Sequence, residues 1–520
     1  SNSASFLTST NHIDVSGAST VGATLEIGNA QYHSRGGFSA TGNINFSHAG
    51  GKLRFYTVSP TSLGTLDNTL GAVIYMSGAT NVLSDDYYTL TIDDGGTAKT
   101  LQGNVNIAGN LNIKSGNELN LGNNNLTLTG NADINGTLDF NNGGVFEIDG
   151  EFDATGGAVK FTGTGGTLKL GGTPTSLGTF TKGTSTIEYD GGNQNVITEG
   201  YHNLEIDAVG TKTAQGNNTV AGTMTVQSGS TYAVAATSTT VTGASDINGT
   251  LTISSGGTYD ANAAYDADGG TVTIDLGGTL FLGNTVTEFG NLTNNGTLHL
   301  DGSSAQTIPG NTTKAAEVLC EVGGTLEISG DDKTCETDGT DFQLKGNLTF
   351  SGATDLIIDN SNSTTLTLFS GTTITGAADD RHIIGASGTD VSVRYSLNSS
   401  SASKELPIGP NGSLRSITIA PTASTTTVYT AQYKVGIPSS ATLDFTNHRC
   451  GMPTSSGNVS TINNDYHYDV AITSGTAQSA NLTVGFVGLD NVPASDKRYL
   501  LHWDGSEWDE LSSSGTGSTV

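Results

Sequence analysis

The residues of this chain that could do chemistry are carboxylates, which occur as adjacent pairs. The four pairs are Asp85/Asp86, Asp93/Asp94, Asp331/Asp332 and Asp379/Asp380. Glycoside hydrolysis needs two carboxyl groups that face each other across the scissile bond, but successive side chains of a strand point to opposite faces. Asp93 also has an equivalent, Asp207, in an internal repeat. We therefore interpret the pairs as turn residues, and we predict a non-enzymatic chain without catalytic residues.

Candidates for a metal or cofactor site are few. Asp260, Asp266 and Asp268 share the segment YDANAAYDADGG (259–270), and oxygen ligands at that spacing could hold Ca²⁺. A loop of solvated aspartates explains the same pattern. The nine histidines show no zinc-type spacing with Cys or with one another. We therefore predict no cofactor, with Ca²⁺ as the one candidate ion.

The cysteines leave two chemical states open. Cys320 and Cys335 lie 15 residues apart, close to the length of one predicted coil. Stacking of coils could therefore join them in a disulfide, which would indicate an oxidising compartment. Two buried thiols fit the same spacing. Cys450 lies beside His448 and Arg449, and we interpret it as structural.

The elements that must carry these residues are short strands. Apolar-x-apolar triplets alternate with Gly/Asn turns, as in LNI (111–113), LNL (119–121) and LTL (126–128). Such period-two triplets, broken by turn residues, indicate strands. Three triplets take up about 20 residues, which we interpret as one coil of a stacked solenoid. Because parallel crossovers are right-handed, the sequence predicts an all-β fold with a right-handed parallel β-helix.

A longer repeat groups the coils. SPTSLGT (59–65) returns as TPTSLGT (173–179), an offset of 114 residues, and other segments return at 113. A looser third copy matches YDGGNQNVI (189–197) with LDGSSAQTI (300–308). The copies keep their turns and apolar triplets while other positions drift. This pattern indicates about three superrepeats in a chain whose shape matters more than any one side chain.

The pattern changes near Ala378. Later strands are longer, as in TVYTAQYKVG (427–436), and contain more Tyr and Trp. Long alternating strands with polar loops are typical of an antiparallel β-sandwich. We predict a β-helix over residues 1–378 and a β-sandwich module over 379–520, truncated at its C-terminal end. Its aromatic residues are either ligand contacts or sandwich core: Tyr466, Tyr468, Trp503 and Trp508.

Charge limits the partners. The chain has 49 acidic and 20 basic residues, a net charge of −29, so nucleic acid and anionic membrane surfaces are poor partners. No stretch approaches the roughly 18 apolar residues of a membrane-spanning helix, so we expect no direct membrane span. Solubility of a long surface explains the acidic excess.

Several segments resemble the repeats of large secreted proteins from Bacteroidota. They include VFEIDGEFDATGG (145–157) and GTKTAQGNNTVAGTMTV (210–226), and KELPIGPNGSLRSITIAP (404–421) is similar to the sandwich module that often follows these repeats. The resemblance implies a parallel β-helix exported through the type IX secretion system. It also implies a cell-surface or adhesin-like role. Surface glycans or other cell-surface and secretion-system proteins are the implied partners.

The first functional hypothesis is a non-catalytic extracellular structural or adhesin-like rod at a bacterial cell surface. Parallel β-helices also host lyases and glycosidases, so a carbohydrate-active enzyme on a β-helix face is an alternative. That alternative requires two carboxylates together with Arg or Lys. A second alternative is a subunit of a surface filament, because uncapped coils are exposed strand edges that a partner must cover.

Overall fold

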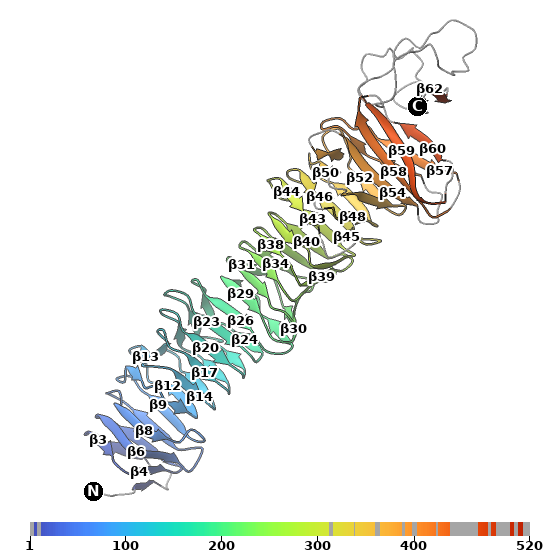
Figure 1. Ribbon diagram of the computed structural model, residues 1–520. Coiled ribbons are helices and arrows are strands. Elements are labelled where there is room, and N and C mark those ends of the chain that lie inside the picture. The colour runs from blue at the N-terminus through green and yellow to red at the C-terminus, as the bar shows by residue number, and fades with distance from the viewer. Residues whose placement is uncertain are drawn as a thin grey trace, which may run out of the picture. The chain divides into compact units, whose positions relative to one another are not determined.

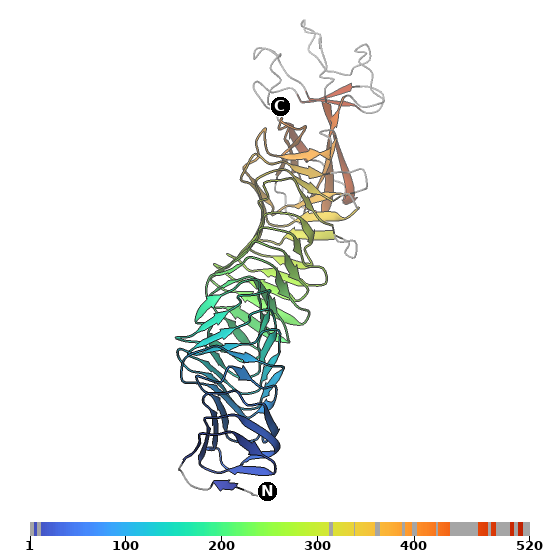
Figure 2. The ribbon, with the colours of Figure 1, turned by 90° about the vertical axis from the view of Figure 1, so that its left-hand side faces the viewer.

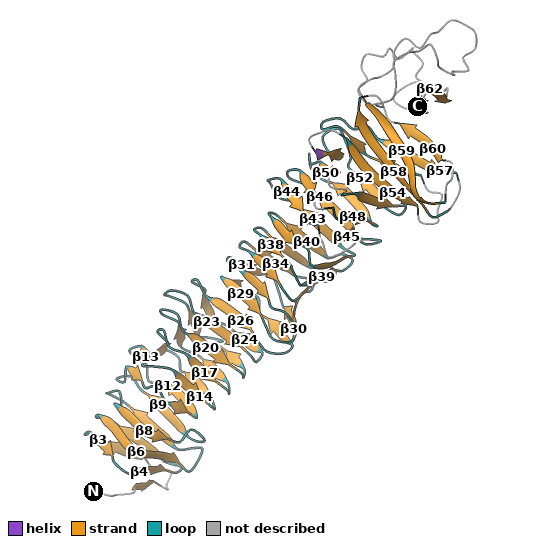
Figure 3. Cartoon of the chain, in the orientation of Figure 1, coloured by secondary structure: helices purple, strands orange, loops and turns teal. Residues whose placement is uncertain are grey.

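The computed structural model gives an all-β chain. It describes residues 5–7, 12–310, 316–336, 339–358, 364–386, 390–397, 403–422, 425–436, 466–476, 480–484, 500–503 and 508–512, with backbone only for the first and the last two segments. These residues hold no α-helix, and apart from a short 3₁₀ turn at Ala386 their elements are the strands β1 to β62 (Figure 3). None of these residues belongs to a helix of the length and apolar character that a membrane crossing requires. The chain divides into two compact units, Ser1–Thr252 and Ile253–Val520.

In the first unit, short strands stack in parallel (Figures 1 and 2). One sheet has nine strands in the order β2 (His12–Val15), β5 (Gln31–Ser34), β7 (Lys52–Phe55), β9 (Ala72–Tyr75), β12 (Thr89–Ile92), β15 (Leu111–Ile113), β18 (Ala132–Ile134), β21 (Phe152–Asp153) and β24 (Pro174–Ser176). A second has β10 (Asn81–Val82), β13 (Lys99–Leu101), β16 (Glu118–Asn120), β19 (Thr137–Asp139), β22 (Ala158–Lys160) and β25 (Thr179–Thr181).

A third sheet of this unit has β11 (Asp86–Tyr87), β14 (Val105–Ile107), β17 (Leu126–Leu128), β20 (Val145–Ile148), β23 (Thr167–Leu170), β26 (Thr186–Tyr189), β29 (Asn203–Ile206), β32 (Met224–Val226) and β35 (Ser245–Ile247). Near the start of the unit, β1 (Ser5–Leu7), β3 (Ser19–Val21), β4 (Thr24–Ile27), β6 (Phe38–Phe46) and β8 (Ser62–Leu66) form another. From β9 to β35, consecutive strands along the chain belong to different sheets, and strands about one coil apart pair. This confirms the predicted parallel β-solenoid.

The core is a set of stacked apolar columns. In β15, Leu111 and Ile113 are buried while Asn112 between them faces outward. Leu111 pairs in register with Leu90 of β12 and with Ala132 of β18. Because side chains alternate between faces, the register places apolar residue above apolar residue. The triplets of the sequence are thus the inward-facing layer of each coil.

The long repeat reappears as a repeated hydrogen-bond pattern. The hydroxyls of Tyr75 and Tyr87 lie 3.0 Å apart in the core, and those of Tyr189 and Tyr201 lie 3.1 Å apart. In each pair the second hydroxyl donates to a backbone carbonyl four residues earlier, at 2.8 and 2.7 Å. Strands β9 and β26, which carry the first tyrosine of each pair, belong to different sheets. The second copy therefore presents its residues on a different side of the coil from the first.

The second and third copies each contain a buried glutamine with the same pattern of hydrogen bonds. Gln194 donates from Nε2 to the carbonyls of Leu170 and Gly172, each at 2.6 Å. Gln306 donates in the same way to the carbonyls of Leu282 and Asn284, at 2.9 and 2.5 Å. In both, Oε1 accepts a glycine N–H at 2.9 Å. The same turn is thus built in both copies.

The second unit continues the parallel stacking. One series is β37 (Thr258–Ala261), β40 (Thr279–Leu282), β43 (Thr297–Leu300), β46 (Thr325–Ile328), β49 (Asn347–Phe350) and β52 (Thr373–Thr375). A second is β44 (Gln306–Ile308), β47 (Lys333–Cys335), β50 (Leu356–Ile358), β53 (Ile383–Gly385) and β56 (Ile408–Gly409). A further pair is β38 (Tyr265–Asp266) with β41 (Val286–Glu288).

Antiparallel pairing begins late in this unit. Strand β54 (Val391–Leu397) ends the parallel series of β45 (Ala316–Cys320), β48 (Asp341–Leu344) and β51 (Leu366–Phe369), and its other edge pairs antiparallel with β58 (Thr427–Val435) and through it with β59 (Tyr466–Gly475). A smaller antiparallel sheet joins β55 (Lys404–Leu406), β57 (Ile417–Pro421) and β60 (Ala480–Val484). Strands β61 (Leu500–Trp503) and β62 (Trp508–Ser512) pair antiparallel. Parallel pairing therefore continues past Ala378, up to the pair of β53 with β56, and β54 is the first of the strands named here with an antiparallel partner.

Candidate functional site

Three strands at the start of the first unit bring histidines and a carboxylate together. His12 lies opposite Gln31, and Asp14 lies opposite His33, in the register of β2 with β5. On β7, Leu53 and Phe55 are fully buried, so the residues alternating with them face outward. The same alternation places His12, Asp14 and His33 on the outer face of this sheet.

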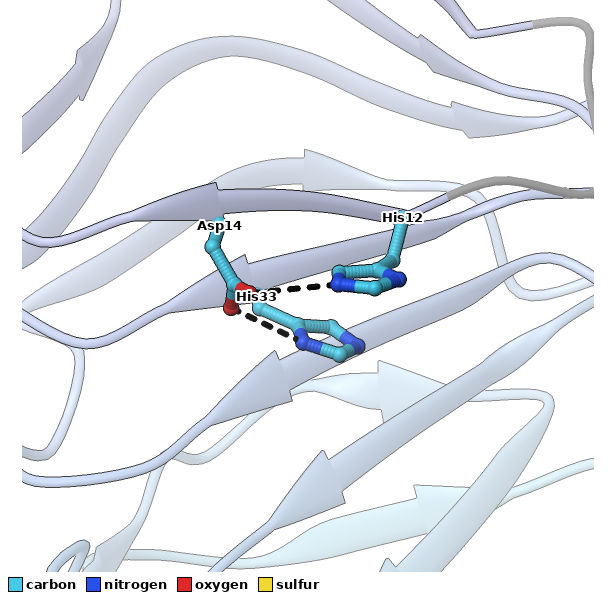
Figure 4. Close-up of side chains that lie close together, drawn as sticks. All are labelled: His12, Asp14 and His33. Atoms are coloured by element: carbon cyan, nitrogen blue, oxygen red, sulfur yellow. Dashed lines mark hydrogen bonds and ion pairs between the residues drawn. The ribbon is translucent and has the colours of Figure 1, made fainter.

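The side chains converge on Asp14. His33 Nδ1 lies 3.0 Å from Asp14 Oδ1, and His12 Nε2 lies 3.2 Å from Asp14 Oδ2 (Figure 4). The two imidazole rings stack with centroids 4.9 Å apart and an interplanar angle of 17°. One ligand-type atom from each residue lies within 4.8 Å of the other two. The register of the strands thus gathers two imidazoles around one carboxylate.

Neighbouring residues enclose His33. Its side chain is 11% exposed although it sits on the outer face, whereas the side chain of His12 is 60% exposed. The Tyr56 ring packs against the His33 ring at 5.3 Å, and the Arg35 guanidinium lies over Tyr56 at 4.4 Å. Arg35 Nε also donates to Asp14 Oδ1 at 3.0 Å. The cluster therefore has one enclosed histidine and one that is open to solvent.

A glutamine fixes which nitrogen of His33 carries a proton. Arg54 Nε donates to Gln31 Oε1 at 3.0 Å, and His33 Nε2 lies 3.2 Å from the same oxygen. Because a guanidinium can only donate, the shared amide atom is an acceptor, and His33 Nε2–H must donate to it. In the neutral ring, Nδ1 then carries a lone pair that faces Asp14.

The charge states follow from burial and from these contacts. Burial lowers the pKa of His33, although Asp14 acts to raise it. Desolvation acts to raise the pKa of Asp14, but the hydrogen bonds and charges of Arg35 and His33 hold it below its usual value. A lowered pKa favours the neutral imidazole and the ionised carboxylate, the forms in which these groups bind metal ions.

A second polar group lies on the third sheet of the first unit. Lys169, Glu188 and Glu205 follow one another in register on β23, β26 and β29. Lys169 Nζ lies 2.7 Å from Glu188 Oε2, and Gln227 Nε2 donates to Glu205 Oε1 at 2.6 Å. Burial raises the pKa of Glu188 even though Lys169 acts to lower it. This Lys–Glu–Glu row combines two carboxylates with a cation on one outer face.

A shallow polar depression of about 300 Å³ lies in the first unit, lined by Thr173, Asn193, Gln194, Asn195, Thr211 and Thr213. Asn195 pairs in register with Thr213. The lining is made of amides and hydroxyls, which are groups suited to hydrogen-bonding hydroxyl-rich ligands.

The acidic pairs found in the sequence are turn residues. Asp85, Asp93 and Asp331 each accept a hydrogen bond from the backbone N–H of the following aspartate, at 2.9, 2.7 and 2.9 Å. Asp207 accepts one from Ala208 at 2.7 Å. Asp379 instead accepts from the backbone N–H of Leu414 at 2.9 Å. The bonds of Asp85, Asp93, Asp331 and Asp207 are local backbone-to-carboxylate contacts of the kind that favours Asp in turns, whereas the Asp379 bond joins residues 35 apart.

The aspartates predicted as Ca²⁺ ligands do not share one face. Asp260 lies on β37, and Asp266 lies on β38, which belongs to a different sheet. Asp266 Oδ1 accepts the backbone N–H of Asp268 at 3.0 Å. Asp266 and Asp268 are therefore joined by a local turn contact, and Asp260 lies on a strand of another sheet.

The two described cysteines are free and buried. Cys320 lies on β45 and Cys335 on β47, in different sheets. Their separation along the chain is less than one coil, so stacking does not place one cysteine above the other. Of the two predicted states, the structure has the buried thiols and not the disulfide. Burial raises the pKa of Cys320 to about 11, and raises that of Cys335 as well. Cys450 lies outside the described residues.

The predicted aromatic contacts divide into two groups. Tyr466 and Tyr468 pack with Tyr433, with ring centroids 5.3 to 6.0 Å apart. Tyr468 donates its hydroxyl to the Arg415 carbonyl at 2.5 Å. These two tyrosines therefore belong to an aromatic cluster of the antiparallel sheet. The side chains of Trp503 and Trp508 lie outside the described residues.

Sequence reasoning missed the cluster around Asp14. The three residues are not adjacent in any motif, because His33 follows Asp14 by 19 residues. That separation is close to the predicted coil length. Aligning successive coils in the sequence could therefore have placed His33 beside Asp14.

Comparison with known proteins gives no relative from which a role could be transferred. No protein-family model matches the chain, and no match is found among curated proteins. The functional argument for this chain therefore comes from its own residues.

Proposed function

We propose that this chain is a non-catalytic extracellular structural or adhesin-like solenoid at a bacterial cell surface. The proposal rests on a comparison of the first two copies of the long repeat, which share core hydrogen bonds but differ at other positions. The buried tyrosine pair recurs with the same hydrogen bonds, whereas Ile74 and Thr91 of the first copy correspond to Glu188 and Glu205 of the second. Ile74, Thr91 and Glu188 alternate with core residues along their strands, although neighbouring side chains cover them. A constant core with varied outward-pointing positions suits a scaffold whose outer layer can change.

The finer features of the sequence interpretation belong to the same proposal. The solenoid winds right-handed, and the antiparallel strands from β54 onward are part of a β-sandwich module. The resemblance to secreted Bacteroidota repeats supports export through the type IX system. The acidic, amide-rich exterior supports surface glycans or cell-surface and secretion-system proteins as partners.

The experiment is a binding screen with the purified chain. Labelled protein is applied to a glycan array and to immobilised cell-surface fractions, with Asn195→Ala/Thr213→Ala as a variant of the polar depression and Asn112→Ala as a matched outward-facing control. We expect retained binding to at least one surface glycan or surface protein, without its chemical alteration. Absence of binding to every surface fraction contradicts the adhesin-like part of the proposal.

A second candidate, a carbohydrate-active enzyme, has one specific observation in its favour. The Lys–Glu–Glu row places two carboxylates on neighbouring strands beside a cation, and strand spacing of about 4.8 Å is near the carboxyl separation of about 5–5.5 Å in retaining glycosidases. Against it, Glu188 is held by Lys169 at 2.7 Å. The test is turnover of a polysaccharide panel by the native chain and by Glu188→Gln and Glu205→Gln. Product formation that both variants lose would replace the first proposal.

A further inference from the structure

The cluster around Asp14 has the donor set and spacing of a metal site. Zinc bound tetrahedrally at about 2.0–2.1 Å holds neighbouring ligand atoms roughly 3.3 Å apart. Asp14 Oδ1 lies 3.0 Å from His33 Nδ1, and Asp14 Oδ2 lies 3.2 Å from His12 Nε2. One ligand atom from each of the three residues lies within 4.8 Å of the other two, so small rotations of the side chains bring them to one ion. From these contacts we propose that His12, Asp14 and His33 bind a divalent transition-metal ion of the Zn²⁺ class on the outer face of β2 and β5.

The backbone holds the three donors in place. His12 and Asp14 are two residues apart on one strand and so share a face, and Asp14 and His33 are paired partners on adjacent parallel strands. The side chains need only rotate to meet one ion. Two imidazoles and one carboxylate suit Zn²⁺ and similar ions, whereas Ca²⁺ and Mg²⁺ take oxygen ligands.

The hydrogen-bond partners of His33 determine which of its ring nitrogens faces Asp14. His33 has two acceptors within hydrogen-bond distance, Gln31 Oε1 at 3.2 Å and Asp14 Oδ1 at 3.0 Å. A neutral imidazole has one N–H, and Arg54 assigns it to Gln31. His33 Nδ1, the nitrogen that lies 3.0 Å from Asp14 Oδ1, is then the one that is available to an ion. An ion bound to Nδ1 and Oδ1 leaves the bond from Nε2–H to Gln31 in place.

Gln31 and Arg54 act as the outer support of the site. Ligating histidines usually donate their other N–H to a carboxylate, carbonyl or water, which fixes the tautomer and the ring orientation. His33 does this through Gln31, whose amide is itself oriented by Arg54. Three protein ligands leave the fourth position for water, as in sites that keep an open position, and the exposure of His12 and Asp14 provides access.

Arg35 competes with the ion for Asp14. Its Nε donates to Asp14 Oδ1, and the two side chains are 45% and 39% exposed. Exposed ion pairs contribute little, so Arg35 can give up this oxygen and keep its position over Tyr56. This predicts that metal affinity rises when Arg35 is neutralised.

The test is calorimetric titration of the metal-free full chain with ZnCl₂, with circular dichroism of every variant. We expect one Zn²⁺ per chain at this site. His12→Asn and His33→Gln each lower the affinity at least about tenfold, Gln31→Leu lowers it about tenfold, and Arg35→Gln raises it. The matched control is His202→Asn, a histidine outside the cluster, which leaves the affinity unchanged.

Co²⁺ supplies an independent readout. Its visible absorption in a tetrahedral site should appear with the native chain and vanish with His12→Asn, whose exposed position spares the fold even if His33→Gln unfolds. The proposal is overturned if the native chain binds no Zn²⁺. It is equally overturned if His12→Asn binds as the native chain does, or if His202→Asn causes the same loss.

Discussion

Removal of one hydroxyl from the buried pair Tyr189/Tyr201 should open the solenoid locally. The Tyr189 hydroxyl accepts the backbone N–H of Ile197 at 3.2 Å and lies 3.1 Å from the Tyr201 hydroxyl. Tyr201 uses its own proton on the Ile197 carbonyl, so Tyr189 must donate to it. Tyr189→Phe therefore leaves the Ile197 N–H without its acceptor and Tyr201 without its donor.

The magnitude follows from burial. Tyr189 and Tyr201 are both fully buried, and an unsatisfied buried polar group costs about 1–3 kcal/mol. Since about 1.4 kcal/mol is a factor of ten, the amide of Ile197 should exchange with solvent roughly 5- to 150-fold faster. A solenoid is held by nearest-neighbour contacts, so the effect should fade within a few coils.

Native-state amide hydrogen exchange is the appropriate assay, because it resolves local opening. The matched control is Tyr75→Phe, which should produce the same acceleration at Leu83, the N–H bound by Tyr75 at 3.2 Å. Unchanged exchange at Ile197 would refute the reasoning. Uniform acceleration over the whole chain would refute the claim that coils depend mainly on their neighbours.

Three further predictions concern buried polar groups. Gln194→Leu should destabilise its turn by about 1–3 kcal/mol and speed hydrogen exchange of the Gly191 amide. Gln306→Leu should have the same effect at the Gly302 amide, and unchanged exchange at both amides would count against the shared turn. Burial lowers the pKa of Lys333 to about 8 from 10.5, although Asp331, Asp301 and Asp332 act to raise it. The unfolded chain then holds the proton more tightly, so stability should rise between about pH 8 and 10.5, a slope that Lys333→Met should lose in urea titrations. In a Cys450→Ser background, Cys320 and Cys335 should resist maleimide until the chain is unfolded, because thiolates are the reactive form; rapid labelling of the native chain would contradict their burial.

Much of the solenoid can be predicted from local pattern. Leu111 and Ile113 are two residues apart with a polar residue between them, and this alternation is sufficient to predict a strand and its buried face. Asp93 could be assigned to a turn because Asp207 repeats it, and the bond from Asp94 N–H confirms that role. Such features depend only on neighbours in the chain.

What the sequence does not give is the register between coils. Asp14 meets His33 only because β2 pairs with β5 at one particular offset, and turn lengths between them set that offset. Cys320 and Cys335 fall on different sheets for the same reason. The nitrogen of His33 that faces Asp14 depends further on the bond from Arg54 to Gln31, one coil beyond. Contacts of this order need the stacked structure.

The measurement that tests the proposed function most directly is labelling of intact cells of the source organism. Antibodies raised against the chain, together with brief protease treatment of unbroken cells, report whether it lies outside. We predict antibody labelling without permeabilisation and loss of the label after protease, while an intracellular marker stays intact. Labelling that appears only after permeabilisation and survives protease would contradict a cell-surface role.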